Sequence, residues 1–341
     1  MGRFVAGDAP SVDAIVAEAI VAIGREISEM RIPLLSGVVL GGGYGRGEGG
    51  VKEERKVENE KCKVDGMSAG GCRLSNDLDF FAISENDTTD EDAAAIASAL
   101  EPLSRRWTEK LGIDVDFTAK TPWRLRHDQE RLMVQELVHG YVDVVGAKGD
   151  VLFEGIPRRK PSELPWMEAA RLLMNRGIGL LLAKGKIENA KGKADGLPDA
   201  DRDFVNLNIN KCILGAGDAT LIARHAYVWR GLDRAAALGD PLYRSALEWK
   251  FRPGDGPVCD WETARGAWLA AKDAVDAASD GSGTRRTLRS AARWVVRRRT
   301  FGELATFGRD PVVRLLERVA RCIRARECMS ASLRRDWEIF N

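Results

Sequence analysis

Apolar positions recur at two different periods along the chain, and the change of period divides it into two parts. In the first part, short apolar runs indicate buried strands, and apolar residues three or four positions apart indicate amphipathic helices. The predicted elements of this part are helices over 11–30, 90–111 and 125–138, strands over 34–40, 78–83 and 113–118, and a hairpin over 140–153. The alternation of strands and helices favours an α/β domain.

From about residue 161 onward the strand signals end and only helical periodicity remains. Clusters of Gly, Pro and Asp separate the helical runs. The predicted helices cover 166–183, 204–232, 236–249, 261–278, 286–296 and 312–327. We therefore expect two domains, an α/β domain over 1–158 and an all-α helical bundle over 159–341.

Residues 51–73 interrupt the first domain. Their sequence, VKEERKVENEKCKVDGMSAGGCR, is charged and then glycine-rich, with almost no apolar periodicity. Such a composition cannot bury a hydrophobic face, so we expect an inserted, mobile loop.

Composition and charge describe a soluble globular protein. The chain has 341 residues, 44% of them hydrophobic and 30% charged, with a formal net charge of +1. No apolar run approaches the ~20 residues that a membrane helix needs, and acidic residues interrupt the N-terminal apolar positions. Six scattered cysteines without a C-x-x-C pair argue against structural zinc and favour reduced thiols, so we expect a cytoplasmic protein without membrane contact.

Residues 41–50, GGGYGRGEGG, form a glycine-rich turn directly after a predicted strand. Glycines such as Gly42 and Gly43 allow the main chain to approach a phosphate closely, and Arg46 adds a charge suited to a triphosphate. The alternative is a tight turn without a ligand. Residues 45–50 also fit a dinucleotide fingerprint, but the charged VKEERK that follows, in place of an apolar helix, disfavours it. No G-K-[ST] occurs, which excludes a Walker-type P-loop.

Acidic side chains mark two of the predicted strands. Asp77 and Asp79 are one residue apart, so on a strand they point to the same side and repel each other unless a cation lies between them. Asp114 and Asp116 alternate in the same way on the next strand, and either can supply a third carboxylate. Three carboxylates can hold two Mg²⁺ ions about 4 Å apart, which together with the glycine turn predicts metal-assisted transfer from a nucleoside triphosphate.

This combination of an apolar strand, a glycine turn, D-x-D and a third strand-borne acid resembles the DNA polymerase beta-like nucleotidyltransferase superfamily. The matching residues are Leu40 to Gly43, Asp77-Leu78-Asp79 and Ile113 to Phe117, and the stretch from Gly42 to Glu48 is similar to the turn of uridylyltransferases. The resemblance covers about residues 35–120 and implies a mixed sheet. The insertion at 51–73 lengthens the usual gap between the glycines and D-x-D, which a surface excursion allows.

The resemblance implies a function of EC 2.7.7 type. Asp77, Asp79 and Asp116 would be the catalytic and metal-binding residues, with Asp116 favoured over Asp114 by the way family strands leave the site. The enzyme would transfer a nucleoside monophosphate, AMP from ATP being the first choice, to a hydroxyl of a small molecule, protein or RNA, and pyrophosphate would leave. Helical domains of such enzymes often carry a lysine that reaches the triphosphate, which makes Lys211 a candidate against the alternative of an ordinary surface lysine.

Two alternatives belong to other functional classes. The segment from Arg285 to Arg335 contains fifteen arginines, which suits an RNA-acting enzyme of the tRNA-end or toxin type, although arginines four apart also form an ordinary solvated helix face. The second alternative is a nucleotide-binding regulator that keeps the fold without catalysis.

Overall fold

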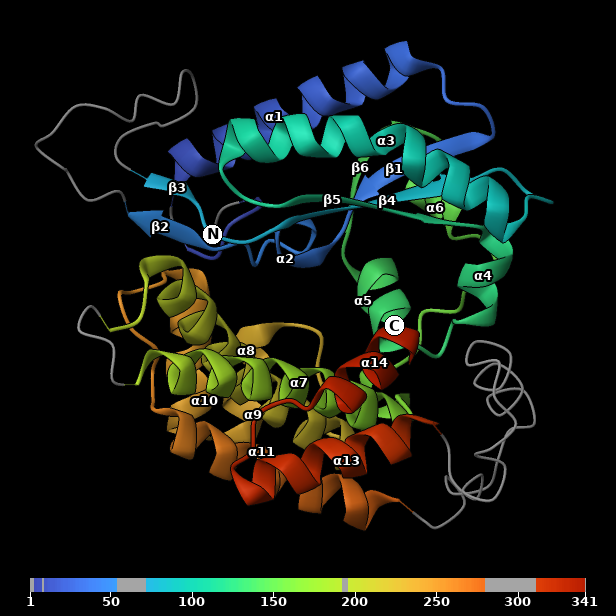
Figure 1. Cartoon of the computed structure of the whole chain (residues 1–341). Helices are drawn as coiled ribbons and strands as arrows, with labels where there is room; N and C mark the ends of the chain where they lie inside the picture. Colours follow the sequence, from blue (N-terminus) through green and yellow to red (C-terminus); the bar gives the residue numbers. More distant parts are fainter. Residues whose placement is uncertain (1–2, 8, 54–71, 192–195, 280–310, 341) are drawn as a thin grey trace, which may run out of the picture. The chain divides into compact units, whose positions relative to one another are not determined.

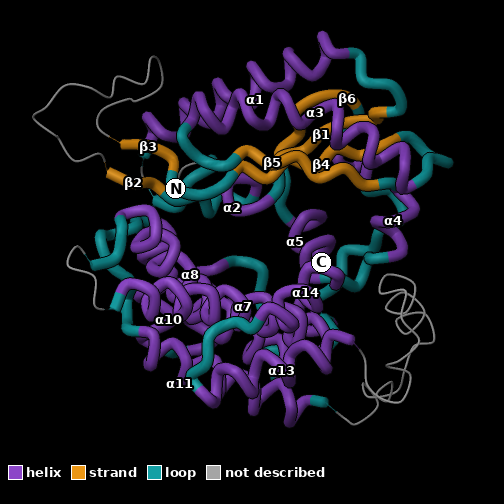
Figure 2. The backbone as a smooth tube through the Cα atoms, in the orientation of Figure 1, coloured by secondary structure: helices purple, strands orange, loops and turns teal. Residues whose placement is uncertain are grey.

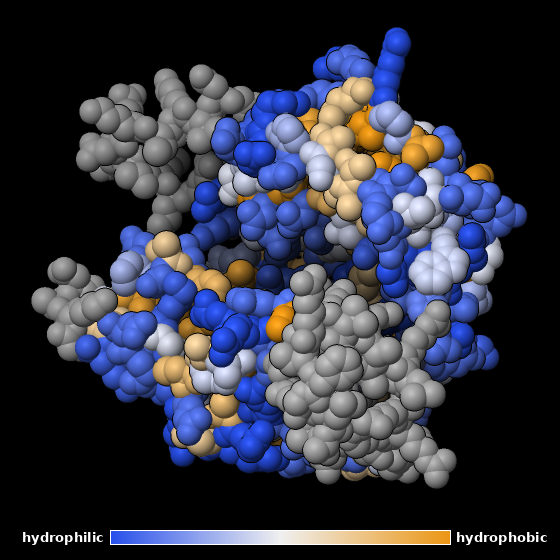
Figure 3. Space-filling model, turned by 45° about the vertical axis from the view of Figure 1, so that its right-hand side comes forward, coloured by the Kyte–Doolittle hydropathy of each residue, from blue (hydrophilic) through white to orange (hydrophobic). Residues whose placement is uncertain are grey.

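The structure of the protein is a computed structural model that describes residues 3–7, 9–53, 72–191, 196–279 and 311–340. The chain divides into two compact units. The first consists of Met1–Arg159 together with Lys250–Gly254, and the second of Lys160–Trp249 together with Asp255–Asn341. No helix in the described ranges is both long enough and apolar enough to cross a membrane. Hydrophilic residues predominate on the face that Figure 3 shows.

The first unit is built on a four-stranded sheet in the order β5-β4-β1-β6 (Figure 2). Its strands are β1 (Leu35–Leu40), β4 (Leu78–Ser84), β5 (Val115–Lys120) and β6 (Val142–Gly146). β1 is antiparallel to both β4 and β6, whereas β4 and β5 are parallel. The predicted mixed sheet is therefore confirmed. A separate antiparallel pair, β2 (Val51–Glu53) with β3 (Cys72–Leu74), flanks residues 54–71, so most of the predicted insertion lies outside the described residues.

Two long helices, α1 (Pro10–Met30) and α3 (Asp90–Leu111), cover one face of this sheet (Figure 1). Alternate strand residues such as Leu78, Phe80 and Val115 point to this face and form the main hydrophobic core with the two helices. α3 begins with a capping box between Thr89 and Asp92 and ends at Gly112 in the left-handed conformation. These two signals explain why its bounds coincide with those predicted from the sequence.

A second, smaller core lies on the opposite face of the sheet. It joins Val39, Phe81 and Ile83 of the strands to the short helices α4 (Pro122–His127), α5 (Leu132–His139) and α6 (Gly149–Leu152). The single helix expected over 125–138 is thus two helices.

The hairpin expected over 140–153 is wrong. β6 pairs with β1, and no strand returns after it within the described residues 147–191. Asp143 accepts a hydrogen bond from the backbone N–H of Gly149 (2.8 Å), and the chain turns into α6, which buries Leu152 in the second core. Apolar side chains of a helix turn therefore explain the pattern that had suggested a second strand.

The described elements of the second unit are helices, preceded by a short 3₁₀ turn, η1 (Pro161–Glu163). They are α7 (Trp166–Ala190), α8 (Asp199–Ala223), α9 (Gly231–Leu238), α10 (Pro241–Phe251), α11 (Trp261–Ala278), α13 (Pro311–Ala325) and α14 (Ala331–Phe340). The last two residues of α10 belong to the first unit. α8 ends earlier than the helix expected over 204–232, because His225 has a left-handed backbone (φ 55°). The helix expected over 286–296 lies outside the described residues, and α14 was not predicted.

Charged residues take part in the packing of this unit. Lys272 on α11 is fully buried and donates to Asp276 (2.6 Å) and to Glu317 of α13 (2.7 Å). Arg234 of α9 is buried and forms an ion pair with Asp218 of α8 (3.0 Å). Because both buried cations are paired, they join neighbouring helices without leaving an uncompensated charge.

Candidate active site

The sheet topology brings the glycine turn and the acidic residues to one edge. β1 is antiparallel to β4, with Leu40 opposite Phe80, so the end of β1 lies beside the start of β4. β5 is parallel to β4 and starts at the same edge. The backbone N–H of Gly41 donates a hydrogen bond to the carbonyl oxygen of Asp79 (2.8 Å), which attaches the turn to the first residues of β4.

The register of the two parallel strands places two of the predicted acids side by side. Asp79 is the direct partner of Asp116, and Phe80 is the partner of Phe117. The two phenyl rings stack on the core face with their centroids 4.9 Å apart. Because side chains alternate along a strand, the two carboxylates lie on the opposite face. Asp77 precedes β4 by one residue and is exposed, as is Asp116, whereas Asp79 is half-buried.

Negative charge accumulates at this edge. The pKa of Asp116 is raised above the ordinary range of a carboxyl group, first by partial burial and then by the charges of Asp114 and Asp77. Burial disfavours the ionised carboxyl, and neighbouring carboxylates add repulsion, so both effects act in the same direction. A cation at this edge would offset the repulsion that Asp114 and Asp77 exert on Asp116.

Gly42 occupies a position that only glycine fits. Its φ is +61°, in the left-handed region, and a Cβ atom there would lie 2.1 Å from Oδ2 of Asp79. The backbone of α2 (Gly42–Gly45) therefore lies directly against the carboxylate of Asp79. Gly43 is also tight, since its Cβ would lie 3.3 Å from the carbonyl oxygen of Glu48. The glycines predicted that the backbone would approach another group closely. Within this unit, that group is the carboxylate of Asp79.

Tyr44, which the sequence analysis did not select, joins the turn to the segment before β4. Its side chain is fully buried, and its hydroxyl donates to the carbonyl oxygen of Gly50 (2.7 Å) and accepts from the N–H of Ser75 (3.2 Å). Gly50 N–H in turn donates to Oδ1 of Asn76 (2.5 Å). We call Tyr44, Gly50, Ser75 and Asn76 the turn clasp. Burial raises the pKa of Tyr44 to about 12, so the hydroxyl stays protonated at neutral pH.

The turn clasp explains how Asp77 stays near the glycines despite the long insertion. It holds the two chain segments that flank residues 51–73, whatever the length between them. The only signal in the sequence for this contact was Tyr44, a single aromatic residue inside a run of glycines.

Arg46 has partners inside the first unit. Its guanidinium pairs with Glu136 of α5 (3.4 Å) and with Glu48 (3.8 Å), and its stem lies over Gly140, whose Cβ would be 2.4 Å from Cγ of Arg46. These contacts fix the turn against α5. A role of Arg46 toward a triphosphate stays a prediction, and it would require the guanidinium to exchange or share these carboxylates.

The donor set at this edge suits Mg²⁺ by its chemistry, since Asp77, Asp79 and Asp116 offer only carboxylate oxygens. In the part of the chain that the structure describes, however, no three His, Cys, Asp or Glu side chains already form a cage around a metal position. The backbone thus brings the carboxylates to one edge, and an ion would have to draw their oxygens together. Part of the rise in the pKa of Asp116 comes from the charges of Asp114 and Asp77, which a cation would offset.

Lys211 lies on α8 of the second unit and is half-buried. Its neighbour Asn210 is buried and bonded within the unit, donating to the carbonyl oxygen of Asn206 (2.8 Å) and accepting from the N–H of Val258 (3.3 Å). The contact of Lys211 with a triphosphate stays a prediction.

Comparisons with known proteins add one similar solved structure. No protein-family model matches the chain, and no curated protein sequence matches it significantly. The chain is similar to spectinomycin adenyltransferase AAD(9) from Enterococcus faecialis, whose structure contains ATP and spectinomycin. The match has 12% sequence identity and a TM-score of 0.42, and it covers 76% of this chain and 99% of the other.

Proposed function

We propose that the protein is a Mg²⁺-dependent nucleotidyltransferase that transfers a nucleoside monophosphate, with ATP as the donor, to a hydroxyl group. One observation carries the proposal. Asp79 and Asp116 are direct neighbours on parallel strands, at the edge where the backbone of Gly42 lies against the carboxylate of Asp79. A glycine turn and strand-borne carboxylates at the same edge are what a metal-bound triphosphate requires.

The reaction assigns a role to each carboxylate. Asp77, Asp79 and Asp116 would hold Mg²⁺, which when bound neutralises charge on the triphosphate and lowers the pKa of the acceptor hydroxyl. Asp116 accepts the proton of that hydroxyl. The acceptor oxygen then forms a bond to the α-phosphorus, the bond from this phosphorus to the bridging oxygen breaks, and the electron pair leaves with pyrophosphate. Gly42 and Gly43 allow the backbone to lie next to the phosphates.

The strand register supports Asp116 rather than Asp114 as the third carboxylate. Asp116 is opposite Asp79, whereas Asp114 precedes β5 and uses its backbone oxygen to accept from the N–H of Leu78 (2.9 Å). Asp114 still contributes negative charge to Asp116. We assign Asp116 to the reaction and Asp114 to its electrostatic surroundings.

A nucleotide-binding regulator without catalysis is the second candidate. Two observations favour it. Among the described residues, no three side chains already form a metal site, and Arg46 is paired with Glu48 and Glu136. RNA is not proposed as an acceptor. Much of the arginine-rich segment lies in 280–310, outside the described residues, and Arg318 of α13 is paired with Asp336.

Labelled nucleotides separate these possibilities. The full chain is incubated with each α-³²P-labelled nucleoside triphosphate and Mg²⁺, with fractionated small-molecule and protein extracts as acceptors, and binding of the same nucleotides is measured calorimetrically. Transfer of label, together with slow acceptor-free release of labelled AMP, supports the enzyme. Binding without transfer or release supports the regulator. If wild type and the Asp77→Ala/Asp79→Ala variant bind nucleotide and Mg²⁺ equally well, the assignment of the site is wrong.

A further inference from the structure

A second concave site lies at the other edge of the same sheet. It is a pocket of about 370 Å³ between the end of β4 and the segments that follow β5 and β6. Ser84, at the end of β4, lines the pocket and lies five residues after Asp79, a separation of roughly 16 Å along a strand. The pocket is therefore distinct from the carboxylate site.

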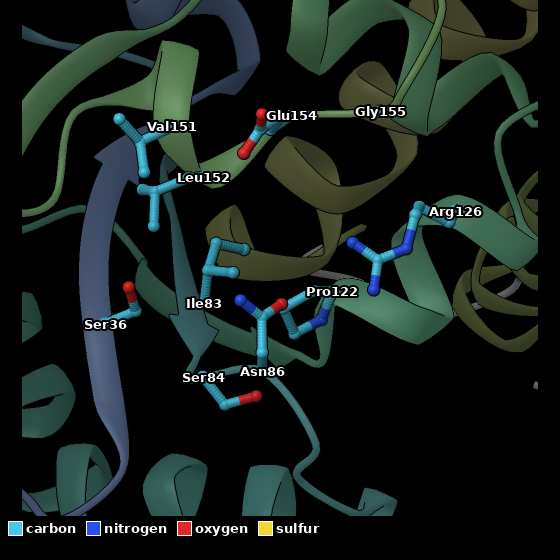
Figure 4. Close-up of a pocket in the computed structure, with 10 residues that line it drawn as sticks. All are labelled: Ser36, Ile83, Ser84, Asn86, Pro122, Arg126, Val151, Leu152, Glu154 and Gly155. Carbon is cyan, nitrogen blue, oxygen red and sulfur yellow. The ribbon is translucent and has the colours of Figure 1, made fainter.

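Two opposite charges face this pocket from different elements. Figure 4 shows the guanidinium of Arg126, from α4, and the carboxylate of Glu154, after α6, both directed toward the space next to Ile83. Within the described residues, Arg126 and Glu154 form no ion pair with each other, and neither residue pairs with another charged side chain. Nearby arginines differ in this respect, since Arg124 pairs with Asp90 and Arg159 with Glu130.

The rest of the lining is apolar or neutral. Ile83 is fully buried and Leu152 nearly so, and both belong to the second core. Val151, at the rim, is 61% exposed. Asn86 adds an amide that can donate to an oxygen or accept from a nitrogen.

We propose that this pocket binds a small zwitterion with an apolar body, a ligand of the α-amino-acid or dipeptide type. Its carboxylate pairs with Arg126 and hydrogen-bonds Asn86, its ammonium group pairs with Glu154, and its side chain packs on Val151 and on the accessible part of Leu152. A simple anion would meet the charge of Glu154, and a simple cation would meet that of Arg126, so a ligand with both charges fits better than either. The volume is in the range of small-molecule sites, which combine apolar walls with a few polar groups.

Calorimetric titration of the full chain, without nucleotide or Mg²⁺, tests this proposal independently of the proposed function. The probes are leucine, phenylalanine and leucyl-leucine, compared with isopentylamine and 4-methylpentanoate, which carry one charge each. We expect saturable binding of at least one zwitterion, with the single-charge probes weaker by about tenfold or more, because each lacks one charge-assisted contact.

Variants locate the binding. Arg126→Gln and Glu154→Gln should each weaken binding of the zwitterion by about tenfold. Val151→Trp, at an exposed rim position, should block the pocket, and circular dichroism should show that the fold is intact. Arg158→Gln and Glu109→Gln, which change exposed charges outside the pocket, should not alter binding. The proposal is overturned if no zwitterion binds at millimolar concentration, if the single-charge probes bind equally well, or if Val151→Trp binds like the wild type.

Discussion

The two ends of β4 differ in how they present charge. At the start of β4 and β5, the acids Asp77, Asp79, Asp114 and Asp116 gather. Partial burial, and then the charges of Asp114 and Asp77, raise the pKa of Asp116. At the end of β4, a guanidinium and a carboxylate from different elements face a pocket whose floor is apolar. The same strand therefore borders one site where several carboxylates gather and one that a side chain of each charge faces.

The difference shows what each end can bind. Carboxylates held together by strand register can lower their mutual repulsion only by taking up a cation or a proton. Opposite charges that do not neutralise each other call for a ligand that carries both. The backbone creates the first arrangement, because neighbouring residues of paired strands must lie side by side, whereas side chains on separate helices and loops create the second.

The largest expected effect concerns the third carboxylate. Asp116→Asn should lower the rate of nucleotidyl transfer on the order of 100- to 1,000-fold, since it removes the proton acceptor and one metal ligand. Asp114→Asn, two positions earlier, is the matched control and should lower the rate much less. Initial rates with labelled ATP decide the matter, and a larger loss in Asp114→Asn would exchange the two assignments.

The close approach of the turn to Asp79 is tested by a pair of glycines that both have a positive φ. Gly42 (φ +61°) and Gly112 (φ +66°) are both left-handed, but only at Gly42 would a Cβ meet the carboxylate. Gly112→Ala should cost about 1 kcal/mol of unfolding free energy from backbone strain alone, and Gly42→Ala about 2–4 kcal/mol because it adds a steric clash.

Urea unfolding measures both glycine variants. If Gly42→Ala costs no more than Gly112→Ala, the turn does not lie against Asp79. The clash should also reduce nucleotidyl transfer, whereas the helix end at Gly112 should not affect it.

The turn clasp should have a smaller effect, mainly on stability. Tyr44→Phe leaves the carbonyl of Gly50 and the N–H of Ser75 without the hydroxyl, so it should cost about 1–3 kcal/mol of unfolding free energy. It should also raise the KM for nucleotide, because the turn and the segment before Asp77 are no longer joined. Tyr141→Phe is the control, since the Tyr141 hydroxyl has no hydrogen-bond partner within the described residues. Equal stability of the two variants would argue against the clasp.

The smallest expected effect is on the pH dependence of stability. The pKa of Asp116 is raised in the folded state, so the folded protein binds this proton more tightly than the unfolded chain does. Stability should therefore fall as pH rises from the ordinary carboxyl range through the raised pKa. Asp116→Asn removes this loss and should raise the melting temperature at neutral pH by about 1–2 °C, while having no such effect below the ordinary carboxyl pKa.

Mg²⁺ provides the second test of this repulsion. Added Mg²⁺ should stabilise the wild type at neutral pH more than it stabilises Asp116→Asn, as measured by thermal melts with and without the ion. A melting temperature that is lower in Asp116→Asn than in the wild type at neutral pH would contradict the raised pKa.

Some elements were predicted well because their signals are local. The helix expected over 90–111 has the bounds of α3, where a capping box and a left-handed glycine mark the two ends, and the helix over 261–278 has those of α11, where Asp260 caps the start. The hairpin over 140–153 failed because apolar residues in a single helical turn resemble those of a short strand. Helix 204–232 was predicted too long because nothing in its periodicity signals the left-handed residue His225.

The sequence by itself determined the parts of the site that depend on neighbours along the chain. Alternation on a strand predicts that Asp77 and Asp79 share a side, and the glycine run predicts a turn that approaches another group closely. Only the tertiary structure decided that this group within the first unit is Asp79 itself and that Asp116 lies opposite it. Likewise, only the fold joined Tyr44 to Ser75 across the insertion. Strand register and clasp contacts are made between residues far apart in the chain, and one residue of slip would exchange the two faces, so no local pattern could specify them.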